Sequence, residues 1–170
     1  MDRHEYPSAE DLRSIRRVRP AQEPRRAARD TESGDRVSMS WTSLRILVVD
    51  DDDGCRQCLS TILAEEGHDI VTAARGWEAL ENARRLRQEN KCLDLSILDF
   101  NMPDLTGIET FRRLLAEYPR LEAVFVTGDP SESLEREIQL VGGRALMRKP
   151  LDVVHIRRIV HGFQGGLAGE

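Results

Sequence analysis

From residue 44 onward, short apolar runs alternate with amphipathic segments five times in succession. The first run, LRILVV at 44–49, is continuously apolar after Arg45, which is typical of a strand buried on both faces. The other predicted strands are 69–73, 95–98, 123–126 and 144–147. The predicted helices cover 59–63 and the residues around them up to Gly67, then 77–87, 107–117, 131–141 and a last segment from Asp152. Because strand–helix–strand crossovers are right-handed, this alternation predicts a parallel sheet with helices on both faces.

The composition fits one small α/β domain. Of 170 residues, 39% are hydrophobic and 32% are charged, and aromatic residues are few (Phe 4, Trp 2, Tyr 2), so the core must consist mostly of Leu, Ile, Val and Ala. The net charge of −5 argues against nucleic-acid binding by the whole chain. No apolar stretch approaches the roughly 18 residues of a membrane span. Without a signal-peptide core, and with three cysteines that form no disulfide framework, the cytoplasm is the expected location.

Residues 1–43 differ from the rest of the chain. They contain three prolines, scattered charge and no sustained apolar period, which predicts a disordered extension. Between Arg13 and Arg29 there are seven arginines and one acid, Glu23, so this segment is either a basic arm for nucleic acid or acidic lipid, or a solvated tail without a partner. Composition favours the second reading. The globular domain is expected over 44–163 and a flexible tail over 164–170, with no separate output domain.

Polar residues gather where the predicted strands end. Asp50 and Asp51 follow the first strand, Asp99 ends the third, Thr127 ends the fourth, and the fifth leads into Lys149. Open α/β sheets place their ligand crevice at this edge. Asp52 and Asp53, which come next, are typical helix-start residues.

Three carboxylates in one crevice repel each other, and a hard divalent cation relieves the repulsion. Mg²⁺ prefers oxygen ligands and keeps several waters. We expect Asp51 and Asp99 to bind it directly and Asp50 to act mainly through water. The backbone carbonyl of Asn101 would supply a further oxygen.

A carboxylate beside Mg²⁺ can also act as a nucleophile and form an acyl phosphate. The three oxygens of the transferred phosphoryl group then need compensating charge or hydrogen bonds. Mg²⁺, Lys149 and the Thr127 hydroxyl together with a backbone N–H would provide them. Asp99 is therefore the predicted phosphoryl acceptor.

These motifs together resemble a known family. VVDD (48–51), LDFNMPDLTG (98–107), VTG (126–128) and KP (149–150) resemble the receiver domain of bacterial response regulators, over about residues 44–163. Each motif alone is weak, but four in order at strand ends form a strong signal. The resemblance implies a flavodoxin-like (βα)5 fold in three layers with strand order 2-1-3-4-5. It also implies Mg²⁺ held by an acidic pair and the acceptor aspartate, with threonine and lysine engaging the phosphoryl group.

The resemblance further implies a phosphoacceptor switch, which is not an enzyme beyond slow self-dephosphorylation, and because no output domain is expected we interpret it as stand-alone. The donor would be a sensor histidine kinase or a histidine phosphotransfer protein. The signal would pass to a downstream protein through the face formed by 131–141, 144–147 and the last helix, or onward in a phosphorelay. No membrane or nucleic-acid partner is expected. One departure concerns the switch: Leu146 stands where the family usually has an aromatic residue that swings inward.

Two other functions compete with this interpretation. A haloacid-dehalogenase-type phosphohydrolase also uses an aspartyl nucleophile, but it needs a second Asp where this chain has Asn101. A phosphorylation-independent binding module of the same fold would instead act through the Arg13–Arg29 arm.

The CxxC pair Cys55 and Cys58 follows a strand, as a redox pair would. Four preceding acids would raise rather than lower the thiol pKa values. We therefore expect two ordinary semi-buried thiols, with Cys58 on the inward face of its helix.

Overall fold

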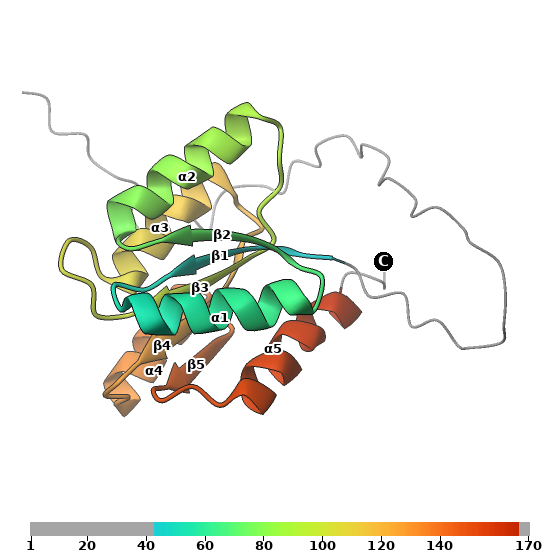
Figure 1. The fold of residues 1–170 in the computed structure, drawn as a ribbon. Coiled ribbons are helices and arrows are strands. Elements are labelled where there is room, and N and C mark those ends of the chain that lie inside the picture. Colours follow the sequence, from blue (N-terminus) through green and yellow to red (C-terminus); the bar gives the residue numbers. More distant parts are fainter. Residues whose placement is uncertain (1–42, 167–170) are drawn as a thin grey trace, which may run out of the picture. The chain divides into compact units, whose positions relative to one another are not determined.

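Five strands and five helices alternate along residues 43–166, the part of the chain that the computed structural model describes, with side chains described as far as residue 163 (Figure 1). The strands are β1 (Arg45–Val49), β2 (Asp69–Ala73), β3 (Leu95–Asp99), β4 (Glu122–Thr127) and β5 (Ala145–Arg148). The helices are α1 (Asp53–Glu65), α2 (Gly76–Gln88), α3 (Gly107–Glu117), α4 (Glu132–Leu140) and α5 (Val153–Gly166). Every predicted element is present, with small shifts at some ends.

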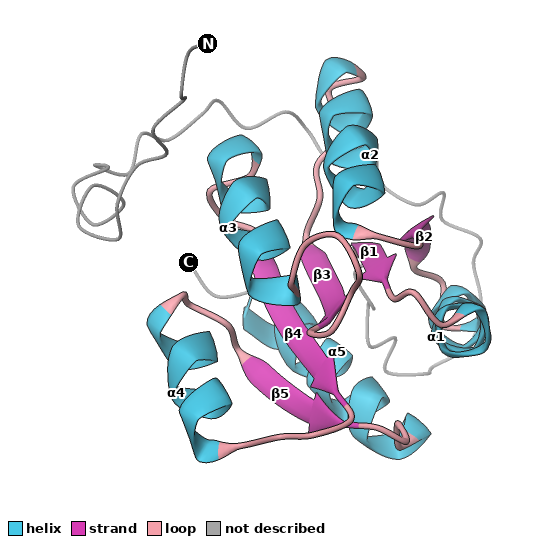
Figure 2. Cartoon of the chain, turned by 90° about the vertical axis from the view of Figure 1, so that its left-hand side faces the viewer, coloured by secondary structure: helices cyan, strands magenta, loops and turns pink. Residues whose placement is uncertain are grey.

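The strands form one parallel sheet in the order β2-β1-β3-β4-β5 (Figure 2). This confirms the predicted flavodoxin-like topology. Because the strands are parallel, their carboxyl ends all lie at one edge of the sheet, which we call the carboxyl edge.

Each face of the sheet has its own apolar core. Leu98 and Phe125 point to one face, where α2, α3 and α4 cover them. Val48 and Ile97 point to the other face, under α1 and α5. Neighbouring strand residues alternate between the two cores because successive side chains point to opposite sides of a strand. Figures 1 and 2 show the resulting three layers, with α1 and α5 on one side of the sheet and α2, α3 and α4 on the other.

Local sequence signals set several helix ends. Asp52 caps α1 by accepting a hydrogen bond from the Cys55 amide at 2.7 Å, which confirms its predicted helix-start role. Thr106 and Glu109 form a capping box at the start of α3. Gly67, the predicted stop of the first helix, has a φ of 86° directly after α1.

The predicted N-terminal extension lies outside the described residues, apart from Ser43. The predicted tail begins at 164, and α5 continues to Gly166. Within the described range, no helix combines the length and apolar character needed to cross a membrane.

The opposite edge of the sheet is held by a buried histidine. His68, only 6% exposed, accepts a hydrogen bond at Nδ1 from the Leu44 amide at 3.2 Å, directly before β1. The neutral ring therefore carries its proton on Nε2. Burial lowers the pKa of His68 below its ordinary value of 6.5, although the charge of Glu66 opposes this. Protonation would place a second hydrogen against the Leu44 N–H and break the bond.

We expect His68→Phe to reduce the free energy of unfolding by about 1–3 kcal/mol, because the buried Leu44 amide would lose its acceptor. The histidine contribution should be complete above pH 6.5 and should decline as the pH falls below that value, since the unfolded chain binds the proton more readily. Urea unfolding of both proteins between pH 5 and 8 measures this.

The exposed His155, changed to Phe, is the control and should leave stability nearly unchanged. Equal losses from the two substitutions would show that the bond between His68 and Leu44 contributes little.

Candidate functional site

The loop between β1 and α1 carries the predicted acidic pair. Asp50 directly follows β1 and is 1% exposed, whereas Asp51 faces solvent. Asp50 Oδ1 accepts a hydrogen bond from the Asp52 amide at 2.9 Å. Arg56 donates to the Asp50 carbonyl at 2.6 Å and also pairs with Asp53, so it ties the loop to α1. Sequence reasoning missed Arg56, and its place in the first turn after four acids was the available signal.

Asp99 is the last residue of β3 and is 5% exposed. The backbone after it is held on both sides: the Phe100 amide donates to the Val126 carbonyl at 2.8 Å, and the Gly107 amide donates to the Phe100 carbonyl at 3.0 Å. Gly107 comes so close that a Cβ there would lie 2.6 Å from the Asp99 carbonyl oxygen. The loop 100–106 therefore leaves Asp99 and returns directly behind it, where α3 begins.

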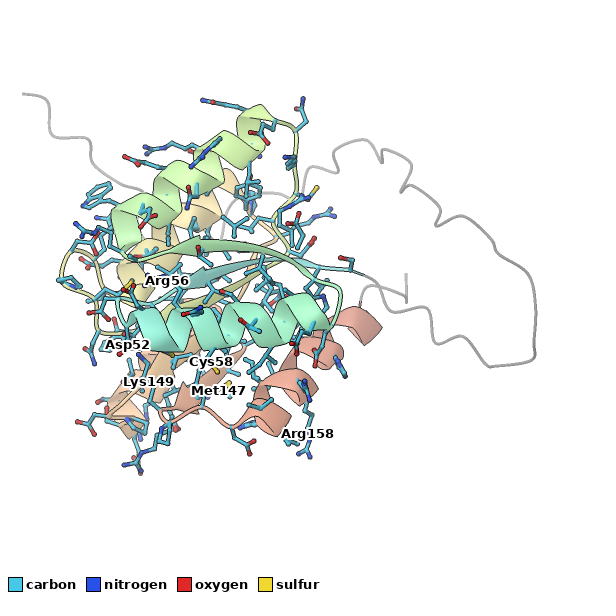
Figure 3. The ribbon with its side chains drawn as sticks, in the orientation of Figure 1. Asp52, Arg56, Cys58, Met147, Lys149 and Arg158 are labelled. Atoms are coloured by element: carbon cyan, nitrogen blue, oxygen red, sulfur yellow. The ribbon has the colours of Figure 1, made fainter. Side chains whose placement is uncertain are left out.

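Lys149 follows β5, and its ammonium group lies between two of the predicted carboxylates. Nζ is 2.9 Å from Asp50 Oδ2, 3.1 Å from Asp50 Oδ1 and 3.2 Å from Asp99 Oδ2. The Lys149 amide donates to the Thr127 carbonyl at 2.8 Å, so β4 positions the backbone of the lysine. Figure 3 shows Lys149 at the same end of the domain as Asp52, the cap of α1. Residues almost a hundred positions apart thus meet at the carboxyl edge.

The electrostatics of this cluster show a deficit of positive charge. Burial raises the pKa of Asp99, and the charges of Asp50 and Asp51 raise it further, against the opposing effect of Lys149. Burial alone would lower the pKa of Lys149, but its hydrogen bond to Asp50 and the charges of Asp50 and Asp99 outweigh burial, and its pKa is raised. Both shifts favour an additional cation at the cluster.

The donor set fits a hard divalent cation. Asp50, Asp51 and Asp99 each offer one oxygen, and these oxygens lie within 4.8 Å of one another. Asp50 Oδ2 is buried and accepts no hydrogen bond from the described residues, although Lys149 faces it as an ion pair. The exposed Asp51 leaves the cluster open to solvent, which suits Mg²⁺ because this ion retains several waters. The exposed Asn101 lies in the loop after Asp99, and ligation through its carbonyl stays a prediction.

Thr127 ends β4, which lies between β3 and β5, and its side chain is completely buried. Its hydroxyl oxygen accepts a hydrogen bond from the Asp129 amide at 3.2 Å. This places the threonine at the carboxyl edge, between the strand of Asp99 and the strand that leads to Lys149. Its engagement with a phosphoryl group stays a prediction.

The two thiols of α1 differ in exposure. Cys58 is exposed, so its predicted inward position is wrong. The buried stripe of α1 runs through Leu59 and Leu63 at four-residue spacing, and Cys55, one step earlier, is the half-buried thiol. Burial and a hydrogen bond with Asp50 raise the pKa of Cys55 to about 12, which opposes a redox role.

Comparison with known proteins settles the family. The model of the response regulator receiver domain matches residues 46–161. This chain belongs to that family. The receiver-domain resemblance and the predicted fold are thereby confirmed.

Curated relatives include Sporulation initiation phosphotransferase F of Bacillus subtilis, which is 29% identical over 116 residues, covering 68% of this chain and 90% of that protein. The transcriptional regulatory protein CreB of Escherichia coli is 33% identical over 106 residues, but the match covers 62% of this chain and 44% of CreB. The sensor kinase/phosphatase CqsS of Vibrio cholerae is matched over only 16% of its length, at 32% identity. This receiver domain thus corresponds to a minor part of several longer relatives.

Solved receiver structures agree with this fold. The chemotaxis protein CheY4 of Vibrio cholerae has 29% identity and a TM-score of 0.64, covering 72% of this chain and 99% of that one. The CheX–CheY–BeF3–Mg²⁺ complex of Borrelia burgdorferi contains a chain with 25% identity and a TM-score of 0.64, and the match covers 70% of this chain and 87% of that one.

Without Mg²⁺, we expect Asp99→Asn to raise the free energy of unfolding of the receiver domain by about 1 kcal/mol at neutral pH. The pKa of Asp99 is raised above 3.8, so the protonated form stabilises the fold at low pH and this contribution is lost as the pH rises through the folded-state pKa. Asn removes the unfavourable charge. Thermal unfolding with and without Mg²⁺ measures the effect, and the stabilisation by Mg²⁺ should shrink in the variant.

Asp69→Asn, at the other edge, is the control, and it should not stabilise because Asp69 pairs with Arg45. A loss of stability in Mg²⁺-free Asp99→Asn would contradict the charge-repulsion account.

We expect Gly107→Ala to destabilise the receiver domain by about 1–3 kcal/mol, because the added Cβ would collide with the backbone of Asp99. Gly128→Ala is a matched control in another loop at the same edge, since a Cβ there meets nothing within 4 Å. Urea unfolding compares the two. Equal stabilities would show that the loop after Asp99 moves aside at little cost.

Proposed function

We propose that this receiver domain accepts a phosphoryl group on Asp99 in a Mg²⁺-dependent reaction and passes the signal on by protein contact. The observation that carries the proposal is the ammonium of Lys149, which lies 3.2 Å from Asp99 and 2.9 Å from Asp50, two buried members of the carboxylate cluster. Such a cluster combines a nucleophile with groups that can neutralise phosphoryl oxygens.

In the proposed reaction, a carboxylate oxygen of Asp99 attacks the phosphorus of a phosphohistidine or of a small acyl phosphate. The new P–O bond forms as the bond to the donor breaks, and the donor nitrogen or carboxylate oxygen leaves with the electron pair. Asp50, Asp51, Asp99 and the Asn101 carbonyl would hold Mg²⁺, which supplies charge neutralisation for the phosphoryl group.

Two further groups of the chain have defined tasks in this scheme. Lys149 keeps its contact with Asp50 and offers its ammonium to a second phosphoryl oxygen. The Thr127 oxygen already accepts the Asp129 amide, which leaves its hydroxyl hydrogen able to donate to a third oxygen. Movement of Thr127 would therefore pull on the start of the loop between β4 and α4.

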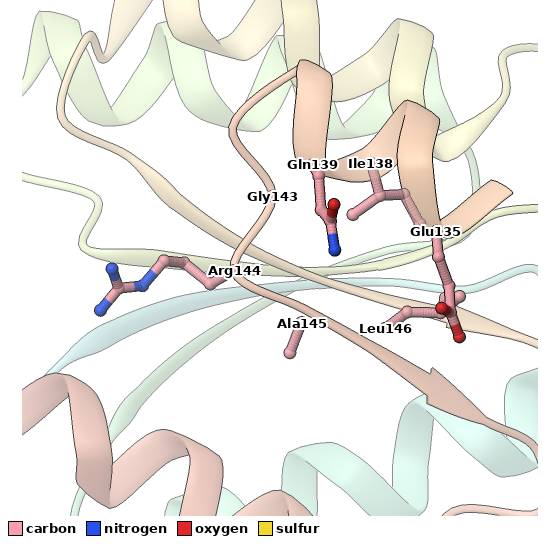
Figure 4. Close-up of a pocket in the computed structure, with 7 residues that line it drawn as sticks. All are labelled: Glu135, Ile138, Gln139, Gly143, Arg144, Ala145 and Leu146. Atoms are coloured by element: carbon pink, nitrogen blue, oxygen red, sulfur yellow. The ribbon is translucent and has the colours of Figure 1, made fainter. Parts of the chain in front are cut away.

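The proposed output surface is the face of α4, β5 and α5. Between α4 and β5 there is a hollow of about 140 Å³ lined by Glu135, Ile138, Gln139, Gly143, Arg144, Ala145 and Leu146 (Figure 4). Leu146 is half-buried there and pairs in register with Phe125 of β4. A conformational change would reach this surface by repacking of Leu146, since the usual aromatic ring is missing.

The partners follow from this chemistry. The donor would be a sensor histidine kinase or a histidine phosphotransfer protein, and the target a downstream protein or the next member of a phosphorelay. The CheX–CheY complex of Borrelia burgdorferi supports the idea of a protein partner for this fold. We propose a cytoplasmic phosphoacceptor switch that is not an enzyme, and the match to phosphotransferase F, which covers 90% of that protein, shows that a receiver domain can make up nearly all of one family member.

Acetyl phosphate with Mg²⁺ should add one phosphoryl group to the wild-type protein, as measured by intact-protein mass spectrometry. Asp99→Ala should show no adduct, and Lys149→Met should react about 100-fold more slowly because a charge on the transferring group is lost. Chelation of Mg²⁺ should abolish the reaction.

Asp52→Ala is the control, because Asp52 caps α1 at the same edge and has no proposed contact with the phosphoryl group. A wild-type protein without an adduct, or an undiminished adduct in Asp99→Ala, would exclude the proposed function.

A further inference from the structure

Helix α2 receives its N-terminal cap from a distant loop. Its own N-cap residue, Arg75, makes no capping hydrogen bond through its side chain. Instead, Asp104 of the loop after β3 accepts the Gly76 amide at Oδ1 (3.1 Å) and the Trp77 amide at Oδ2 (2.9 Å). One carboxylate thus satisfies two amides of the first turn across 27 and 28 positions of sequence.

Close packing joins the same two segments. A Cβ on Gly76 would lie 2.5 Å from Thr110 Oγ1 of α3 and 2.7 Å from Leu105 Cβ. Met102 and Leu105, on either side of Asp104 in the loop, are 8% and 7% exposed and lie in the core under α2 and α3. The start of α2 is therefore in van der Waals contact with the same loop whose Asp104 accepts its amides.

This loop carries the acceptor region of the site. It leaves Asp99, contains Asn101 and closes at Gly107, whose amide bonds to the Phe100 carbonyl. Its two ends are held by backbone hydrogen bonds, and the carboxylate of Asp104 anchors its middle to the start of α2. A shift of the middle would move the Asn101 carbonyl relative to Asp99.

We propose that Asp104 is a positioning residue, which holds the loop after Asp99 in the geometry needed for Mg²⁺ binding by capping helix α2. The inference rests on the proposed function, because it assigns Asp104 a task toward the same site. A negative charge at a helix N-terminus suits this task. Burial would raise the pKa of Asp104, but the backbone hydrogen bonds from Trp77, Leu105 and Gly76 outweigh it and the pKa is lowered, so the anchor is charged at neutral pH.

The test compares Mg²⁺ affinity and amide hydrogen exchange in the full chain. Asp104→Ala should weaken Mg²⁺ binding, measured by calorimetry, about 10-fold, as is typical when a group that orients metal ligands is lost. In the Mg²⁺-free protein, the Gly107 amide should exchange faster than in the wild type. Asp104→Asn should give intermediate values of both properties, because its single carboxamide oxygen can accept one of the two amides and its NH2 group can accept neither.

Asp94→Ala is the matched control. Asp94 also accepts a backbone amide of another element, that of Arg45 at 2.8 Å, but it lies at the edge of the sheet away from the site. This variant should be less stable yet bind Mg²⁺ like the wild type. If Asp104→Ala does not fold, Asp104→Ser replaces it, since the shorter side chain reaches at most one of the two amides, and an intermediate loss of affinity is expected.

Wild-type Mg²⁺ affinity in Asp104→Ala or Asp104→Ser would overturn the inference alone, and Asp104 would then only cap α2. An equal loss of affinity in Asp94→Ala would also overturn it, because general destabilisation would explain the effect. A wild-type protein that binds no Mg²⁺ and takes no phosphoryl group would overturn the proposed function and this inference together.

Discussion

Electrostatic repulsion among carboxylates at the carboxyl edge is the constraint around which the rest of the domain is arranged. Asp50 and Asp99 are almost completely buried at the ends of the adjacent strands β1 and β3, and the ammonium of Lys149 lies between them. Left to themselves, such groups would separate or take up protons. They stay together because apolar cores on both faces of the sheet fix the strands that carry them. Stability from the core thus maintains a site that is electrostatically unfavourable until a cation joins it.

The sequence predicted the fold and the placement of the main site residues for one reason. A continuous apolar run such as 44–49 has few alternatives to a buried strand, and parallel topology then sends every strand end to the same edge. Asp50, Asp99, Thr127 and Lys149 are each attached to such an end, so local pattern and handedness place them at one edge, and the strand order that the resemblance implied brings them together. No knowledge of side-chain packing is needed for that step.

Contacts between side chains and distant backbone could not be predicted in this way. The bond between His68 and Leu44 and the cap of α2 by Asp104 join residues 24 to 28 positions apart, and each depends on how a loop packs. The prediction of an inward Cys58 was wrong for a related reason. The side chain of Cys58 lies on the solvent side of α1, although that of the neighbouring Leu59 is buried. Hydrophobic periodicity predicts where a helix lies, but it does not decide which of two adjacent residues at the edge of the apolar face is buried.

The hydrogen bonds from the start of α2 to Asp104 also affect which side chains at the start of this helix can be replaced. Asp104 bonds to backbone amides, which every residue except proline carries, so the contact does not depend on the side chain of Trp77. That side chain is 47% exposed and can change identity without loosening the loop. Gly76 has no such freedom, because Leu105 and Thr110 occupy the space of its missing Cβ. The start of α2 therefore combines an attachment through the backbone with an exposed side chain, on which recognition by different partners could evolve independently of the acceptor chemistry.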